Sequence, residues 1–223
     1  MLFWVLQKSM KKGRYVILVI LAIAGVYIAQ SIFTDRNKAE LERVAQIYFN
    51  GDVDTALIEI NKYLDTYPKD DLAWTIKGNM LADKDLDKEA KEAYEKSLSL
   101  NPENFQATNA LGVIYRKEGD YDTAMEFYRK ALELKPGYAQ AYSSMAVIEL
   151  KRNHDTKALE YAKRGYEEDK EDPVIAANLA IVYHYNGMIE ERDTYTEIAE
   201  KLGYRNMEAL YQIYSGELIV KDE

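Results

Sequence analysis

Apolar residues recur along most of this chain at the spacing that places them on one face of an α-helix. In one stretch, Leu111, Ile114 and Tyr115 follow one another at helical spacing, and Tyr128 and Leu132 do so a little further on. Side chains three or four residues apart share one side of a helix, because a helix turns once in about 3.6 residues. The pattern therefore predicts an all-α chain built from amphipathic helices that come in pairs.

The same arrangement returns every 34 residues in five consecutive units, without an insertion. The central unit has Leu and Gly at its seventh and eighth places, Tyr at its eleventh, Ala at its twentieth, Tyr at its twenty-fourth and Pro at its thirty-second. Small residues at the eighth and twentieth places allow two helices to approach closely, and an aromatic at the twenty-fourth fills space between neighbouring units. The units cover residues 37–70, 71–104, 105–138, 139–172 and 173–206.

A 34-residue period with these residues resembles the tetratricopeptide-repeat family. The resemblance begins at about residue 37 and implies a right-handed solenoid of helical hairpins, which we expect a capping helix over residues 207–219 to close. Three units end in Asp70, Asn104 and Asp172, which are suited to capping the helix that follows. The fifth unit has Arg192 where the family has Ala, and we expect this residue to loosen its helix pair.

The stretch before the repeats predicts a membrane anchor. Residues 15–33 contain no charge and are long enough to cross a hydrocarbon core about 30 Å thick. Residues 1–14 carry four basic residues and no acid, which keeps them in the cytoplasm by the positive-inside rule. We therefore expect a transmembrane signal-anchor at 15–33, a linker at 34–36 and the repeats on the opposite side. Two alternatives remain, a signal peptide cleaved after Ala24 and a buried core helix.

Charge and composition exclude several classes of function. The chain has a net charge of −9, and the part after residue 33 has −13, which repels nucleic acid and anionic lipid. It has no cysteine, and its two histidines, His154 and His184, lack the spacing of metal ligands. Ser143 and Ser144 lack the glycine setting of a nucleophilic serine. We expect no cofactor, no metal and no catalytic site, so the protein is not expected to be an enzyme.

The resemblance implies that a protein partner binds on the concave surface, which the first helix of each unit forms. Carried onto this sequence, the candidate partner-binding residues are Tyr48, Phe49, Asn79, Gln106, Asn109, Arg116, Lys117, Gln140, Lys151 and Tyr185. The three cations are expected to sit together near the middle, where they and the amides hold the backbone and acidic side chains of a peptide or helix. Only Asn79 matches the clamp with which some family members bind a chaperone's terminal carboxylate, so that activity is not expected.

These inferences predict a membrane-tethered scaffold for protein–protein interaction in an envelope assembly, translocation or secretion complex. The assignment to such a complex rests on analogy between folds. Two alternatives stay open: an organelle-membrane receptor with cytosolic repeats, and a repeat protein that assembles with copies of itself.

Overall fold

The computed structural model of the protein describes residues 37–220, and in this range the chain forms eleven helices and no strand. The all-α array that the sequence predicts is thus confirmed. The predicted basic tail, transmembrane anchor and linker, residues 1–14, 15–33 and 34–36, lie outside the described residues. Among the helices of residues 37–220, none combines the length and the apolar character that crossing a bilayer requires.

The chain divides after Pro68 into two compact units, and each is described here by itself. The first contains the helical residues 37–49 and α2 (Val53–Thr66). Val44 and Ile60 are almost completely buried, and the Arg43 guanidinium pairs with the Glu59 carboxylate at 2.5 Å. These contacts join the two helices into one hairpin.

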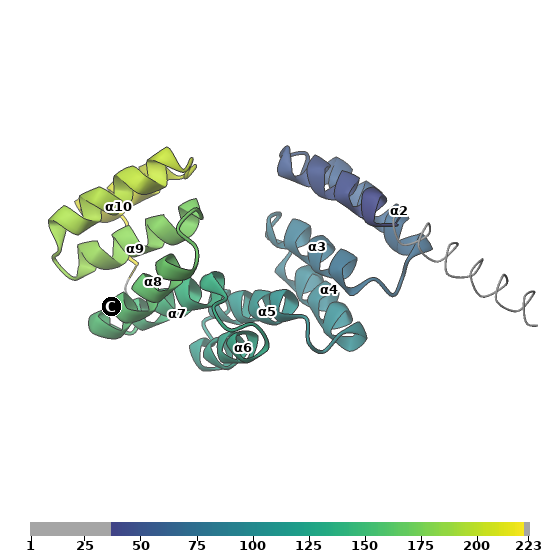
Figure 1. Ribbon diagram of the computed structural model, residues 1–223, viewed down its shortest axis with the longest axis horizontal. Coiled ribbons are helices and arrows are strands. Elements are labelled where there is room, and N and C mark those ends of the chain that lie inside the picture. The colour runs from purple at the N-terminus through teal and green to yellow at the C-terminus, as the bar shows by residue number, and fades with distance from the viewer. Residues whose placement is uncertain (1–36, 221–223) are drawn as a thin grey trace, which may run out of the picture. The chain divides into compact units, whose positions relative to one another are not determined.

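The second unit repeats this hairpin four times and ends in a single helix (Figure 1). Its first helices start 34 residues apart, and each packs against the second helix of its own hairpin. Helices α5, α7 and α9 also pack against the second helix of the hairpin before them. Contacts also join α5 to α7 and α7 to α9, so these first helices lie side by side. The helices are α3 (Asp71–Ala82), α4 (Asp87–Leu100), α5 (Phe105–Lys117), α6 (Tyr121–Leu134), α7 (Ala139–Lys151), α8 (Asp155–Glu168), α9 (Pro173–Tyr185), α10 (Ile189–Lys201) and α11 (Met207–Ser215).

The side chain that ends one 34-residue repeat caps the first helix of the next repeat. Asp70, Asn104 and Asp172 each accept a hydrogen bond from a backbone N–H in the first turn of α3, α5 and α9. Such bonds satisfy backbone donors that have no partner inside the helix, which is why these residue types favour the position. The three predicted caps are confirmed. At the start of α7, Tyr138 supplies no such bond.

Glycine at the eighth place of a repeat makes room for the aromatic ring at the twenty-fourth place of the same repeat. A Cβ atom added to Gly112 would lie 2.5 Å from the ring of Tyr128, and one on Gly78 would overlap the ring of Tyr94. The ring therefore covers the glycine of its own hairpin, whereas the sequence predicted only a role between neighbouring units. Tyr94 has that role as well, since it belongs to one core cluster with Leu111 of α5.

The last hairpin and α11 differ from the sequence expectation in two respects. The Arg192 guanidinium lies 4.9 Å from the Tyr214 ring and pairs with Asp193, and α9 and α10 remain packed together, so the predicted loosening is not observed. α11 ends at Ser215 rather than at 219, because Gly216 adopts a left-handed conformation with φ of 79°. Glycine reaches that conformation without a steric penalty, and it commonly stops a helix there.

Candidate functional site

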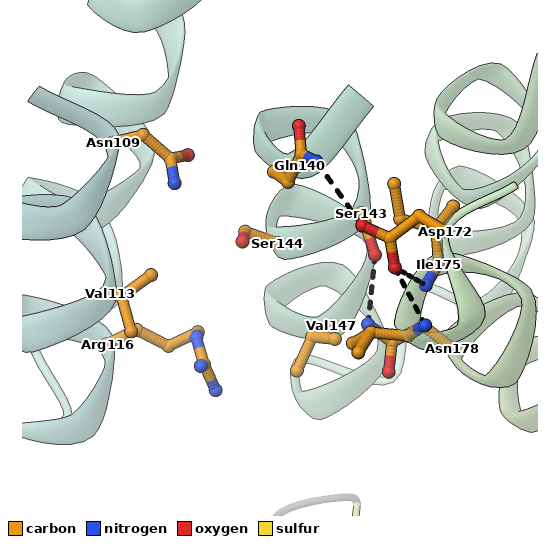
Figure 2. A pocket seen from close by; sticks show the side chains of 11 residues that line it. Asn109, Val113, Arg116, Gln140, Ser143, Ser144, Val147, Asp172, Ile175 and Asn178 are labelled. Atoms are coloured by element: carbon orange, nitrogen blue, oxygen red, sulfur yellow. Dashed lines mark hydrogen bonds between the residues drawn. The ribbon is translucent and has the colours of Figure 1, made fainter. Parts of the chain in front are cut away.

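The first helices of three successive hairpins, α5, α7 and α9, form an open groove in the second unit. Its volume is about 320 Å³. Figure 2 shows side chains of α5 facing those of α7, with α9 on the other side of α7. The lining residues are Asn109, Val113, Arg116, Gln140, Ser143, Ser144, Val147, Asp172, Val174, Ile175 and Asn178.

Two polar side chains on α5 carry buried atoms that have no hydrogen-bond partner. These atoms are Oδ1 of Asn109, a residue that is only 8% exposed, and Nε of Arg116. Buried polar groups in proteins are nearly always paired, because leaving one unpaired costs about 1–3 kcal/mol. Both residues line the groove, so a bound ligand is a candidate partner for these groups.

Beneath the groove lies Tyr128 of α6, which is completely buried. Burial raises the pKa of Tyr128, while the charge of Arg116 and hydrogen bonding to the Arg116 and Ser144 side chains lower it. The guanidinium is thus positioned between a buried phenol and the open groove.

The only carboxylate of the lining, on Asp172, is occupied by internal hydrogen bonds. Its Oδ1 accepts from the backbone N–H groups of Val174 and Ile175 at 2.8 and 3.2 Å, and its Oδ2 accepts from Gln140 Nε2 at 3.3 Å. Nearby, Asn178 Nδ2 donates to Ser143 Oγ at 2.9 Å. Figure 2 shows these bonds on the α7–α9 side of the groove. That side therefore has its polar groups paired, and the unpaired groups are on α5.

Apolar side chains complete the lining. Val113 belongs to α5, Val147 to α7, and Val174 and Ile175 to α9. Val174 is 52% exposed, which is high for a valine in a folded chain. The groove thus offers an apolar surface beside a cation and an amide, the usual composition of a site that binds a peptide.

The structure brings three of the ten predicted binding residues together: Asn109, Arg116 and Gln140 all line the groove. The predicted grouping of three cations is wrong. The Lys117 ammonium pairs with Asp87 at 2.9 Å and Asp85 at 3.4 Å, and the Lys151 ammonium lies 6.0 Å from the Tyr121 ring. Acidic and aromatic groups at the starts of α4 and α6 attract these side chains away from the groove.

Five more predicted residues have other surroundings. Asn79 accepts a hydrogen bond from the Tyr94 hydroxyl at 2.9 Å, and Gln106 is exposed outside the groove lining. Tyr185 is covered by the C-terminal tail, because its hydroxyl accepts from the Val220 N–H at 3.0 Å. The remaining two, Tyr48 and the 74% exposed Phe49, belong to the first unit, where their rings lie 6.0 Å apart.

Eight lining residues are not among the ten predicted ones. Two of them, Ser144 and Asn178, occupy the sixth place of their repeats. The second, sixth, ninth and thirteenth places form one helical stripe at spacings of three and four, so a wider stripe would have included them. Asp172 was recognised only as a cap, and Ile175 had no signal, because its 2% exposure follows from packing.

No arrangement for catalysis or metal binding is evident among residues 37–220. Within that range, no three or more His, Asp or Glu side chains are grouped so as to hold a metal ion. His154 Nδ1 and Glu149 Oε2 lie 2.7 Å apart beside a turn. The His184 ring lies 5.1 Å from the Tyr214 ring, and burial together with Arg192 lowers the pKa of His184.

Comparison with known proteins agrees with this architecture. Two family models of the tetratricopeptide repeat match residues 88–139 and 115–180. No curated protein matches the sequence significantly. Many solved structures share the fold, among them TTC0263, a thermophilic TPR protein of Thermus thermophilus, with a TM-score of 0.69 and 19% identity over 82% of this chain and 100% of that one.

Two further structures are similar over nearly the same range. PilW, a type IV pilus biogenesis factor, has a TM-score of 0.63 at 18% identity and covers 81% of this chain and 89% of its own. Pseudomonas aeruginosa pilF has a TM-score of 0.62 at 17% identity, with 81% and 85% covered. At such identities the likeness concerns the fold alone. Together, the family matches and the 34-residue helical hairpins show that the chain carries tetratricopeptide repeats.

Proposed function

We propose that this protein is a scaffold that binds a peptide segment of a partner protein in the groove between α5, α7 and α9. Tetratricopeptide-repeat proteins are protein-interaction scaffolds and are typically not enzymes. The observation that carries the proposal is the pair of unpaired buried atoms, Asn109 Oδ1 and Arg116 Nε, beside an apolar lining. A bound peptide supplies both the missing hydrogen bonds and an apolar contact.

A tryptophan at position 147 is expected to block this site. Val147 lies on α7 within the lining, so a larger side chain there fills the groove and clashes with a bound peptide. Peptides selected from a random display library on the full chain should bind the Val147→Trp variant at least about tenfold more weakly, which fluorescence anisotropy would measure.

The matched control is Lys130→Trp, which places the same side chain at an exposed position of α6 outside the groove. This variant is expected to bind the selected peptides like the unmodified chain, and thermal unfolding should show that both variants are folded. Equal binding by Val147→Trp and the unmodified chain would place the peptide site elsewhere and overturn the proposal.

We further propose that residues 15–33 tether the scaffold to a membrane, with residues 1–14 in the cytoplasm and the repeats on the other side. The uncharged run and the four preceding basic residues support this arrangement. PilW, which shares the fold, is a type IV pilus biogenesis factor. A role of this chain in envelope assembly, translocation or secretion is compatible with that fold-level analogy.

Protease accessibility tests the orientation. Protease added outside intact cells from which the wall has been removed is expected to degrade the repeats of the full chain and to spare a cytoplasmic marker protein. Repeats that are protected until the cells are lysed would contradict the orientation. In that case they face the cytosol, as in the alternative of an organelle receptor.

A further inference from the structure

We infer that the groove recognises an extended peptide in which an acidic side chain, bound by Arg116, has apolar residues as its immediate neighbours. This inference rests on the proposed function, since it names the chemistry of the peptide that the groove takes. It commits to the carboxylate of an internal Asp or Glu rather than to the end of a chain.

The guanidinium of Arg116 favours an anionic partner. Arg116 and Asp172 are its only ionisable lining residues. The Asp172 carboxylate accepts three hydrogen bonds from Val174, Ile175 and Gln140, whereas Arg116 has no carboxylate partner among the described residues. The lining thus carries no net charge, but its carboxylate is held by neutral donors within the chain, while the guanidinium is left to pair with an anion. A carboxylate would gain more there than at the acidic surface around it.

The geometry of the guanidinium favours a carboxylate within that class. Nε of Arg116 is buried and has no hydrogen-bond partner. A carboxylate accepts from Nε and a terminal nitrogen at the same time, which forms the two parallel hydrogen bonds that arginine makes best. A single backbone carbonyl oxygen would leave one of these donors without a partner.

The position of Asn109 indicates how far the peptide extends from its acidic residue. It precedes Arg116 by seven residues on α5, which at 1.5 Å per residue separates the two by about 10 Å along the helix. An extended peptide spans that distance in about three residues. Asn109 offers both an acceptor and a donor to the peptide backbone, so the chain continues about three residues beyond the acid on that side.

The α7–α9 side of the groove determines which residues precede and follow the acidic residue in the peptide. In an extended peptide, consecutive side chains point in opposite directions. When the acid points towards Arg116 on α5, the residues before and after it point towards α7 and α9. The side chains that meet them there include Val147, Val174 and Ile175, which are apolar. The expected motif is an acid with an apolar residue on each side.

The test is a double-mutant cycle with acetylated, amidated synthetic peptides that contain the apolar–Glu–apolar motif, each paired with its Glu→Gln counterpart. On the full chain, the Gln peptide is expected to bind about 10- to 100-fold more weakly, since a hydrogen bond to a charged group contributes about 1.5–3 kcal/mol. On the Arg116→Gln chain the two peptides should bind equally. Arg129→Gln, which removes the same charge from an exposed position outside the groove, should preserve the difference.

The possible failures are distinguishable. If the Glu and Gln peptides bind equally and Val147→Trp abolishes the binding of both, the groove is the site but the inference about its chemistry is wrong. If a free terminal carboxylate restores the binding of the Gln peptide, the groove recognises a chain end and the inference is also wrong. If Val147→Trp leaves the binding of the Glu peptide unchanged, both this inference and the proposed function fail.

Discussion

Replacing Tyr128 with alanine is expected to lower the free energy of unfolding by about 3–5 kcal/mol. The ring is completely buried against Gly112, in one cluster with Met145 and Ile148 of the next hairpin. Its removal leaves a cavity at the junction of two hairpins, where the backbone of α5 cannot collapse inward without breaking its own contacts. Urea denaturation followed by circular dichroism measures the loss.

Tyr128→Phe is the matched control, because it keeps the ring and removes only the hydroxyl. That hydroxyl lies beside the Arg116 and Ser144 side chains, and its loss should change the unfolding free energy by less than about 1.5 kcal/mol, the net contribution of one hydrogen bond. A phenylalanine variant as unstable as the alanine variant would show that the hydroxyl, rather than the packed ring, holds the hairpins together.

Replacing Asn104 with alanine is expected to cost about 2–4 kcal/mol, because this side chain connects three helices and caps one of them. Its Oδ1 accepts from the Ala107 N–H at the start of α5, and its Nδ2 donates to Asp71, Thr75 and Ser97. Alanine loses the cap, which contributes about 1 kcal/mol, and leaves buried hydroxyl groups with fewer partners, at about 1–3 kcal/mol. The same denaturation experiment measures the effect.

Asp120→Ala separates the cap from the polar network. Asp120 caps α6 through the Thr123 N–H at 3.1 Å. Hydrogen bonding to the Thr123 side chain, and after it to the Thr123 backbone N–H, lowers the pKa of the exposed Asp120 carboxyl. A lowered pKa stabilises the fold above the ordinary value of 3.8, and the benefit fades as pH falls through the lowered value. At neutral pH, Asp120→Ala should therefore lower the free energy of unfolding, but clearly by less than Asn104→Ala does. Equal losses would mean that the network around Asn104 adds nothing beyond its cap.

The spacing of residues along the chain was sufficient to predict the hairpins. Helix period, a small residue at the eighth place and a capping side chain at the unit boundary act within one hairpin or between adjacent ones. Gly78, Gly112, Asn104 and Asp172 show this, because each has the local role that its position indicated. The length of α11 was overestimated, since the stop depends on the conformation of Gly216 rather than on the apolar pattern.

The binding face was predicted less completely, because side chains at neighbouring places of one helix can have different partners. Arg116 and Lys117 are adjacent, yet one lines the groove and the other pairs with Asp85 and Asp87 of the preceding hairpin. Tyr185 stands at a predicted binding place, but the chain returns after α11 and covers its hydroxyl with Val220. Long side chains reach about as far as the neighbouring hairpin, so tertiary neighbours decide their orientation.

Helix geometry follows from contacts three or four residues apart, and these can be read along the chain. Which polar atoms remain unpaired depends on every group that surrounds them, including groups distant in sequence. Asp172 shows the difference. Its role as a cap was evident from its position, whereas its hydrogen bond from Gln140 arises only when α7 and α9 pack together.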